Sequence, residues 1–491
     1  MLIVAVGLFA ATANVAAAAP RERTVAVRVV PVFPLAEYAS RGAVGTMVPA
    51  SGSSVSRETA LASLLRGKLE NSLLGGEPGG KPLISLGGPP APVTVYVSLP
   101  PPGKHHNLRR YPIAVVGGGY RGILTSSATK IPGIVSIADV APSVRALERG
   151  EAPILGSRAA EDAPRQVEET NERLDAAHHS RKKTNRTLIA LVFGFAALAW
   201  ALRSRYCARA ALLAVPATVL ASAIASALHV EHSIRWWTGA IALPIVLPLA
   251  ALRGRFMPLA LAAPLVAYAV FLGAARDTVS LAAIGPHPEG GGRYYGLTNQ
   301  VETLLLGPAL ALGALVSLPF AALVAVCSLV VVGWSGLGAD GGGLIVYATG
   351  FAALALLRAR ARLTPLRAAA ATAVVVALGL ALVGLDALTG GSSHVTHAVG
   401  GGPGGLLSDL GHRLHLSWRG IVNKTDHLEI ALVSLAALVA LALLRRRSRT
   451  LDALLVALAV SLLVNDSGFD VLRFGALVAI AVFTWAAVEG Q

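Results

Sequence analysis

Three acidic residues stand where polar loops enter apolar segments, and they are the strongest candidates for chemistry in this chain. Glu302 ends the motif RYYGLTNQVE, Asp340 lies in GLGADGGG and Asp466 lies in NDSGFD. An unpaired carboxylate beside apolar surroundings is costly, so such residues usually serve a function. Carboxylates that share a site can act as general acid and base, or hold a cation. We predict that these three converge as catalytic residues.

Polar and basic residues around these acids are suited to holding a substrate. Arginine pairs with phosphate or carboxylate, tyrosine stacks on a sugar ring, and glycine-rich turns let backbone amides approach a ligand. The candidate substrate-binding residues are Arg293, Tyr294, Asn299, His394, His397, Arg413, Arg419, Lys424 and Asn465. The two histidines are spaced so that they could share a helical face and hold a divalent metal, the one cofactor that these residue types suggest.

Each motif also has a purely structural interpretation. Residues 285–302 could form a flexible turn with interfacial tyrosines and a Thr/Asn helix cap, and GADGGG a tight reentrant turn. The stretch HRLHLSWRGIV, residues 412–422, fits an amphipathic interfacial helix as well as an anionic lipid-phosphate site. NDSG could be an Asx turn that caps a helix. The sequence leaves these alternatives open.

Membrane-spanning helices must position these residues. The 491 residues are 54% hydrophobic and only 14% charged, which is too apolar for a soluble protein of this size. The net charge of +15 does not indicate a nucleic acid partner, because thirteen arginines fall into four short loops between apolar segments, where they orient helices and meet anionic lipid. Those arginines are Arg203, Arg205, Arg209, Arg253, Arg255, Arg358, Arg360, Arg362, Arg367, Arg445, Arg446, Arg447 and Arg449.

The arginine loops also predict which side of the membrane each motif faces. The chain has eleven apolar spans, at approximately 187–202, 210–228, 236–252, 257–274, 298–316, 318–333, 344–357, 367–385, 429–444, 451–464 and 471–488. An even number of spans separates each arginine loop from the next, so all four lie on one side, which the charge rule makes cytoplasmic. The three acidic motifs then face outward from the plasma membrane.

The region before the spans divides into three parts. Residues 1–19 resemble a signal peptide or anchor, 20–157 an extracytoplasmic α/β domain and 158–186 a polar, exposed helix or stalk. The α/β prediction rests on β-branched runs at 25–32, 93–99 and 113–116 and on a helical stretch at 56–74. The expected fold is therefore an α-helical polytopic bundle of about eleven spans, residues 187–491, with a small N-terminal α/β domain.

Two stretches of the exported domain carry a resemblance. YPIAVV (111–116) and GILTSSATKIPGIVSIADVAPS (122–143) look like a segment late in alkaline-phosphatase and sulfatase-type domains. The membrane part, with RYYGLTNQ, GADGGG and NDSG, resembles uncharacterised bacterial polytopic proteins that carry such a domain, and the Ala/Gly/Val/Arg-rich composition is typical of a high-GC, actinobacterial genome. The resemblance implies a shortened, inactive relative kept for binding, because about 130 residues without an Asp/His ligand series cannot form the two-metal site. Asp139 is then expected to cap a helix.

Three functions fit these observations. An outward-facing enzyme, such as a transferase acting on a lipid-linked envelope precursor, would place acids and phosphate-binding arginines at the outer boundary. A transporter or flippase of an envelope component is the first alternative, disfavoured because the span centres hold no ionisable groups. The second is a scaffold that binds envelope proteins through its degenerate phosphatase-like domain. The expected partners are membrane lipid or a lipid-linked precursor.

Overall fold

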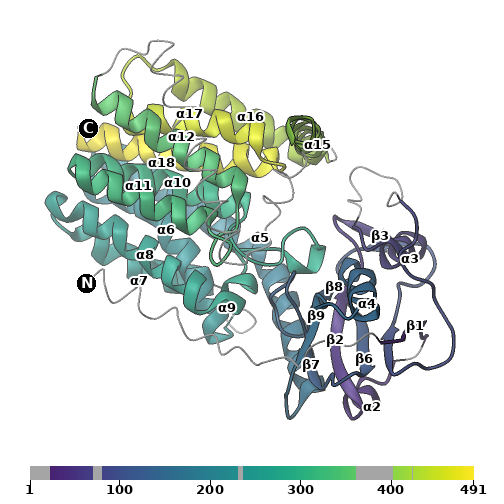
Figure 1. Cartoon of the computed structure of the whole chain (residues 1–491). Helices are drawn as coiled ribbons and strands as arrows, with labels where there is room; N and C mark the ends of the chain where they lie inside the picture. The colour runs from purple at the N-terminus through teal and green to yellow at the C-terminus, as the bar shows by residue number, and fades with distance from the viewer. Residues whose placement is uncertain are drawn as a thin grey trace.

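The computed structural model describes residues 23–31, 33–69, 80–230, 236–360, 402–422 and 424–490. In this part of the chain an α/β domain packs against one end of a bundle of apolar helices (Figure 1). The predicted signal peptide at 1–19, the predicted span at 367–385, His394 and His397 lie outside the described residues.

The α/β domain is built on a mixed sheet in the order β1-β4-β6-β2-β7-β9, with β8 also paired to β2. The strands predicted within 25–32, 93–99 and 113–116 correspond to β1, β4 and β6. The fully buried central strand β2 was not predicted, because its sequence GAVGTMV contains two glycines, which favour turns. The elements are β1 Val25–Val29, α2 Leu35–Ala39, β2 Gly42–Val48, β3 Ser54–Ser56, α3 Arg57–Arg66, β4 Val93–Val97, β5 Lys104–His106, β6 Tyr111–Gly117, β7 Gly122–Ser126, β8 Ile134–Ser136, η2 Ile137–Asp139, α4 Val140–Glu148 and β9 Leu155–Arg158.

Local capping sets the helix ends in this domain. Helix α3 begins after Ser56, whose side chain accepts a hydrogen bond from the Thr59 amide, and it stops at Gly67, which has φ +63°. The helix predicted to reach residue 74 therefore ends earlier, because glycine adopts this left-handed conformation readily. Asp139 closes a capping box with Ser136, and its Oδ2 also accepts a hydrogen bond from Ser126 Oγ at 2.7 Å. Its predicted capping role is confirmed.

The predicted stalk and first span form one continuous helix, α5, Ala163–Leu202. At 1.5 Å per residue its 40 residues extend about 60 Å. Val167 packs in the α/β domain, whereas Leu188 and Val192 belong to the core of the bundle. The expected helix is confirmed, but it is not exposed on all sides, since one face of it is buried along both parts of the molecule.

Ten of the eleven predicted spans lie in helices of the bundle. Six described helices are long and apolar enough to cross a membrane: α5, α6, η3 together with α8, α12, α16 and α18. The number eleven stays a prediction. The bundle elements are α6 Arg205–Leu228, α7 Trp237–Ala251, η3 Gly254–Phe256, α8 Met257–Ala274, α9 Arg276–Ser280, η4 Pro288–Gly290, α10 Asn299–Leu315, α11 Leu318–Gly333, α12 Gly341–Arg358, α15 Gly402–Val422, α16 Thr425–Leu443, α17 Arg449–Val464 and α18 Gly468–Glu489.

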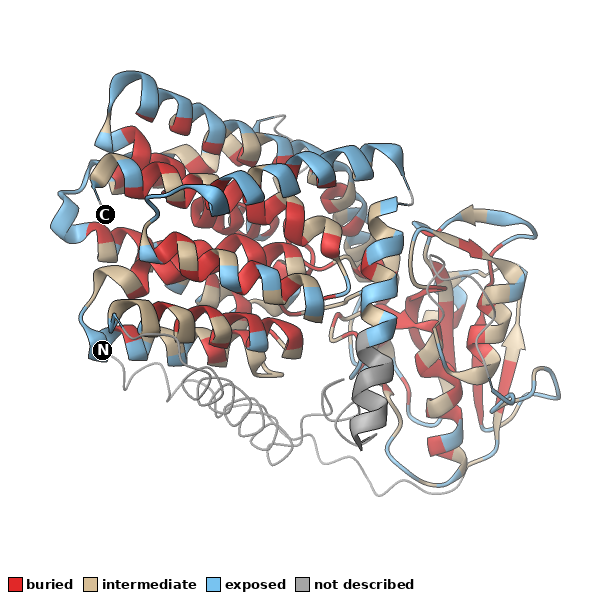
Figure 2. Ribbon diagram, turned by 90° about the horizontal axis from the view of Figure 1, so that it is seen from above, coloured by how far each residue is buried: buried red, intermediate tan, exposed pale blue. Residues whose placement is uncertain are grey.

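Burial separates central helices from peripheral ones. Helix α6 is buried along almost its whole length, whereas α16 exposes large apolar side chains such as Val433, which is 71% exposed (Figure 2). Large apolar side chains are also exposed on α8 and α11, and a lipid environment favours such an exterior because lipid chains solvate these side chains and water does not. The helical part is therefore a membrane protein by its surface as well as by its composition.

The arginine-rich helix ends gather at the end of the bundle away from the α/β domain. Arg209 pairs with Glu489 at 2.5 Å and donates to the Leu252 carbonyl at 2.7 Å, so the start of α6 and the ends of α7 and α18 meet there. Arg358 donates to the Val316 carbonyl at 2.8 Å, which brings the joint between α10 and α11 to the end of α12. In these contacts, helix ends that the charge pattern assigns to one side of the membrane lie beside one another, and the side that they face stays a prediction.

Candidate functional site

A glycine-rich loop, residues 285–298, connects α9 to α10 and lies between the α/β domain and the bundle (Figure 1). Its Gly290 carbonyl accepts hydrogen bonds from the Gly52 amide at 3.0 Å and from Asn107 Nδ2 at 3.3 Å. Gly291 has φ +65°, and a Cβ there would collide with the Ala50 carbonyl. The loop therefore rests backbone against backbone on the α/β domain, which only glycine permits.

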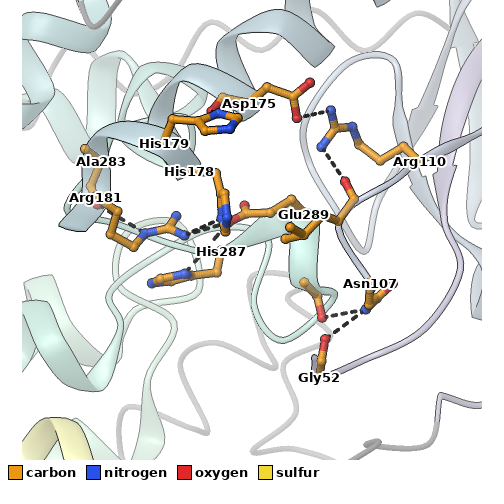
Figure 3. A network of polar contacts seen from close by, with 12 residues as sticks. Gly52, Asn107, Arg110, Asp175, His178, His179, Arg181, Ala283, His287 and Glu289 are labelled. Carbon is orange, nitrogen blue, oxygen red and sulfur yellow. Dashed lines mark hydrogen bonds and ion pairs between the residues drawn. The ribbon is translucent and has the colours of Figure 1, made fainter. Parts of the chain in front are cut away.

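A buried ionic network holds this loop to α5 (Figure 3). Glu289, 3% exposed, accepts hydrogen bonds from Arg181 Nη1 at 2.6 Å and contacts His178 Nδ1 at 3.3 Å. Burial alone would raise the pKa of Glu289, but the His178 contact and the Arg181 charge outweigh burial and hold the pKa below its ordinary value. Nearby, Arg110 of the α/β domain pairs with Asp175 of α5 at 2.7 Å. These contacts fix the loop and the α/β domain to the same helix.

The second half of the loop carries the two tyrosines into the α/β domain. Tyr294 packs against a cluster that includes Ile131 and Ile134, so its ring is engaged in the protein rather than free to stack on a sugar. The Lys130 ammonium lies 4.0 Å from the centre of the Tyr295 ring and donates to the Ser335 carbonyl at 3.3 Å. Lys130 thus contacts both loops that lead to the carboxylates, the one before α10 and the one before α12.

At the bundle end of these loops Arg293, Asp340 and Glu302 come together. Arg293 Nη1 lies 2.6 Å from Asp340 Oδ2, and Asp340 Oδ1 accepts the Gly343 amide at 3.0 Å as the N-cap of α12. Glu302 is 2% exposed, and no N–H group of a described residue donates to either of its carboxylate oxygens. It interacts with Asp340, and a Cβ on Gly343 would collide with it. An ionised Glu302 would be an uncompensated buried charge, so it needs a proton or a cationic ligand.

Asn299 and Asp466 complete the cluster on its more exposed side, and Asn465 completes it on a buried side. Asn299 Nδ2 donates to Asp466 Oδ1 at 2.8 Å, which joins the start of α10 to the turn before α18. Asn465 is 2% exposed and donates from Nδ2 to Ser461 Oγ at 2.9 Å, while its Oδ1 has no partner among the described residues. A Cβ on Gly342 would lie 2.5 Å from that Oδ1. We call Arg293, Asn299, Glu302, Asp340, Asn465 and Asp466 the carboxylate cluster.

The helix starts around the cluster contribute positive potential. Helices α10, α12 and α18 begin at Asn299, Gly341 and Gly468, directly beside these side chains. Amide groups at a helix start are not used within the helix and carry a partial positive charge, which favours an anion. Together with Arg293, they make the potential around the carboxylates more positive.

The remaining predicted site residues divide into near and distant ones. Arg413 Nη1 lies 3.4 Å from the Val464 carbonyl, next to Asn465. Arg419 donates instead to His415 at 3.2 Å on an exposed face, and Lys424 is exposed between α15 and α16. The structure therefore brings seven predicted residues to this region, places Tyr294 in the α/β domain and leaves Arg419 and Lys424 outside it. In the described residues no group of three or more His, Cys, Asp or Glu side chains is placed to hold a metal.

A separate cavity of about 440 Å³ lies between the α/β domain, α5 and the ends of α6 and α9. Its walls include Arg158, Arg173, His229 and Asp277, and none of the sequence-predicted site residues lines it. Its charges are mixed in sign, which indicates no single class of ligand.

The network around Glu289 was missed at the sequence level. The signal that could have indicated it is Glu289 itself, an acid directly before three glycines in GPHPEGGG, because an acid buried in such a turn needs a cationic partner.

Comparison of the chain with protein-family models, with curated proteins and with solved structures finds no match.

Proposed function

We propose that this protein is an integral membrane enzyme of the cell envelope whose carboxylate cluster transfers a group to or from a lipid-linked precursor. The observation that carries the proposal is Glu302, deeply buried beside the Arg293 and Asp340 ion pair, with no N–H group of a described residue donating to either carboxylate oxygen. A residue placed in this way is unfavourable for stability, which is expected where a group is kept for proton transfer.

The cluster supplies the parts that such a transfer needs. Arg293, whose side chain is 32% exposed, and the amides at the helix starts would bind the phosphate of the carrier. Asp340 orients Arg293. Glu302 in its protonated form would not repel phosphate and could give a proton to the leaving group, and in its ionised form could take one from an acceptor hydroxyl. Asp466 and Asn299, at the exposed side, would contact the acceptor.

The proposed orientation places the α/β domain and the carboxylate cluster outside the cell. It rests on the described arginine-rich helix ends at the opposite end of the bundle, since such loops stay in the cytoplasm. The α/β domain would act as a support that holds the two loops of the site, because Lys130 and Tyr294 join it to them.

Coupled transport is less well supported by the position of Glu302. Its carboxylate lies in the first turn of α10, at the end of the bundle, rather than near the middle of a span where coupling ions usually bind.

Lipid retained by the purified protein tests the proposal. The full chain, extracted in mild detergent, should retain a polyprenyl-phosphate lipid above its share of the membrane, as measured by mass spectrometry. Arg293→Gln should lower this retention by roughly 10-fold or more, because a charge-assisted hydrogen bond contributes about 1.5–3 kcal/mol. The matched control is Arg209→Gln, which breaks an ion pair with Glu489 at the other end of the bundle and should leave retention unchanged. No enrichment in the wild type, or equal losses in both variants, would contradict the proposal.

A further inference from the structure

Helix α15 runs across the bundle instead of along it. Figure 1 shows it end-on beside α16 and α18, which are seen lengthwise, and Figure 2 shows it along its length, crossing the end of the bundle that faces the α/β domain. Helices that span a membrane lie roughly along its normal, so a helix perpendicular to them lies in the membrane plane.

The inner side of α15 is fixed to the bundle. Ser417 is 6% exposed, its Oγ donates to the Asn465 carbonyl at 2.9 Å and accepts the Gly468 amide at 3.1 Å. Arg413, on the same side, reaches the Val464 carbonyl. The helix is therefore tied to the end of α17 and the start of α18, and it cannot turn about its own axis.

The outer side divides into two stripes. Leu414, Trp418 and Val422, four residues apart, are 39%, 61% and 39% exposed and form an apolar stripe. His412, His415 and Arg419, spaced by three and four residues, form an exposed basic stripe beside it, in which Arg419 donates to His415. A helix in water does not gain from exposing an ordered row of Leu, Trp and Val, and a helix buried in protein does not expose a basic row.

We propose that α15 is a membrane-surface helix, with its apolar stripe inserted among the lipid chains and its basic stripe at the level of the headgroup phosphates. Lipid is what contacts the apolar stripe, because the neighbouring helix α16 exposes Leu432 and Val433, which are 58% and 71% exposed. The hydrocarbon of the membrane therefore reaches the same side of the bundle. Tryptophan prefers the boundary between chains and headgroups, and arginine pairs with phosphate. Arg419 is thus assigned to the bilayer surface and not to a substrate.

The position of α15 also sets the depth of the carboxylate cluster. Ser417 holds Asn465, a member of that cluster, and Gly468 beside it, so the cluster lies near the depth of α15, at the headgroup layer where the phosphate of a lipid carrier lies. This consequence rests on the proposed function, whereas the placement of α15 does not.

Depth-dependent quenching tests the placement. The full chain, with Cys207 and Cys327 replaced by serine, is labelled with a fluorophore at Trp418→Cys or at His415→Cys and reconstituted into phosphatidylcholine bilayers. Spin labels on the lipid chains should quench most of the signal at position 418 and little at 415, and spin labels on the headgroups should quench position 415.

Two control positions calibrate the result. Val433→Cys on α16 should be quenched from the lipid chains, and Glu37→Cys on the α/β domain by neither probe. Leu414→Cys repeats the measurement on the apolar stripe should the first variant fold poorly. Quenching of 418 by neither probe, or equal quenching of 415 and 418 by the chain probe, would overturn the proposal. The result does not depend on whether the carboxylate cluster binds a lipid carrier.

Discussion

Replacing Arg293 with glutamine should destabilise the protein more than replacing both members of its ion pair. Arg293 Nη1 lies 2.6 Å from Asp340 Oδ2, and the two side chains are 32% and 7% exposed. Glu302 interacts with Asp340 on the same side. The single variant therefore leaves Glu302 and Asp340 with no cation beside them. The double variant, which adds Asp340→Asn, also removes one negative charge. Its asparagine still caps α12, because asparagine caps a helix as well as aspartate does.

The exposed fractions set the size of the effect. Removing one member of a fully buried pair costs about 3–5 kcal/mol, and the exposure of Arg293 lowers this to about 2–3 kcal/mol for Arg293→Gln. We expect the double variant to recover about 1–2 kcal/mol of that loss, roughly a 5- to 30-fold change in the ratio of folded to unfolded protein.

The free energy of unfolding can be measured by titrating the chain in bicelles with a denaturing detergent. Wild type, both single variants and the double variant complete a thermodynamic cycle, which isolates the coupling between the two side chains. Losses that simply add in the double variant would show that Arg293 does not compensate Asp340.

Three further outcomes follow from the contacts between the domains and from the charge pattern. Gly291→Ala, which forces a Cβ against a carbonyl of the α/β domain, should speed proteolysis between the domains, whereas Gly290→Ala, whose Cβ would meet its nearest atom at 4.0 Å, should not. Burial would raise the pKa of Glu289, but the neighbouring imidazole and guanidinium groups outweigh it and hold the pKa below the ordinary value of 4.5. The stability that Glu289 contributes is therefore present above pH 4.5 and is lost as the pH falls below it. Thermal unfolding of Glu289→Gln, measured against pH, should lack this part of the pH dependence. In a cysteine-free background, His229→Cys should react with an impermeant reagent in intact cells and Arg446→Cys should not; the reverse pattern would invert the proposed topology.

The convergence of the carboxylates was predictable because each of them stands at the start of a helix, on the side of the membrane opposite to the arginine loops. Asp340 caps α12, and Glu302 lies in the first turn of α10, positions that acids favour in any helix. Once the arginine loops assign the helix directions, these starts must meet at one end of the bundle. Which of them touch was not predictable, since contact depends on how the helices pack.

The interface between the domains could not be predicted for the same reason. Glu289 and Arg181 are 108 residues apart, and nothing local in either segment indicates the other as its partner. Tyr294 was predicted to contact a substrate because an aromatic residue in a glycine-rich loop suits a ligand, whereas in the structure the α/β domain fills that role. The continuity of α5 was missed because its polar first half and apolar second half differ in composition while both favour a helix.

Turnover of a lipid-linked precursor distinguishes the proposed chemistry from a purely structural role of the carboxylate cluster. Wild type and Glu302→Gln, in proteoliposomes, are given lipid-linked precursor together with acceptor material, both extracted from bacterial envelopes, and the carrier is followed by mass spectrometry. The wild type should move the linked group to an acceptor and free the carrier, while Glu302→Gln should bind the intact lipid without turning it over. Equal turnover by both proteins would exclude Glu302 as the residue that transfers the proton.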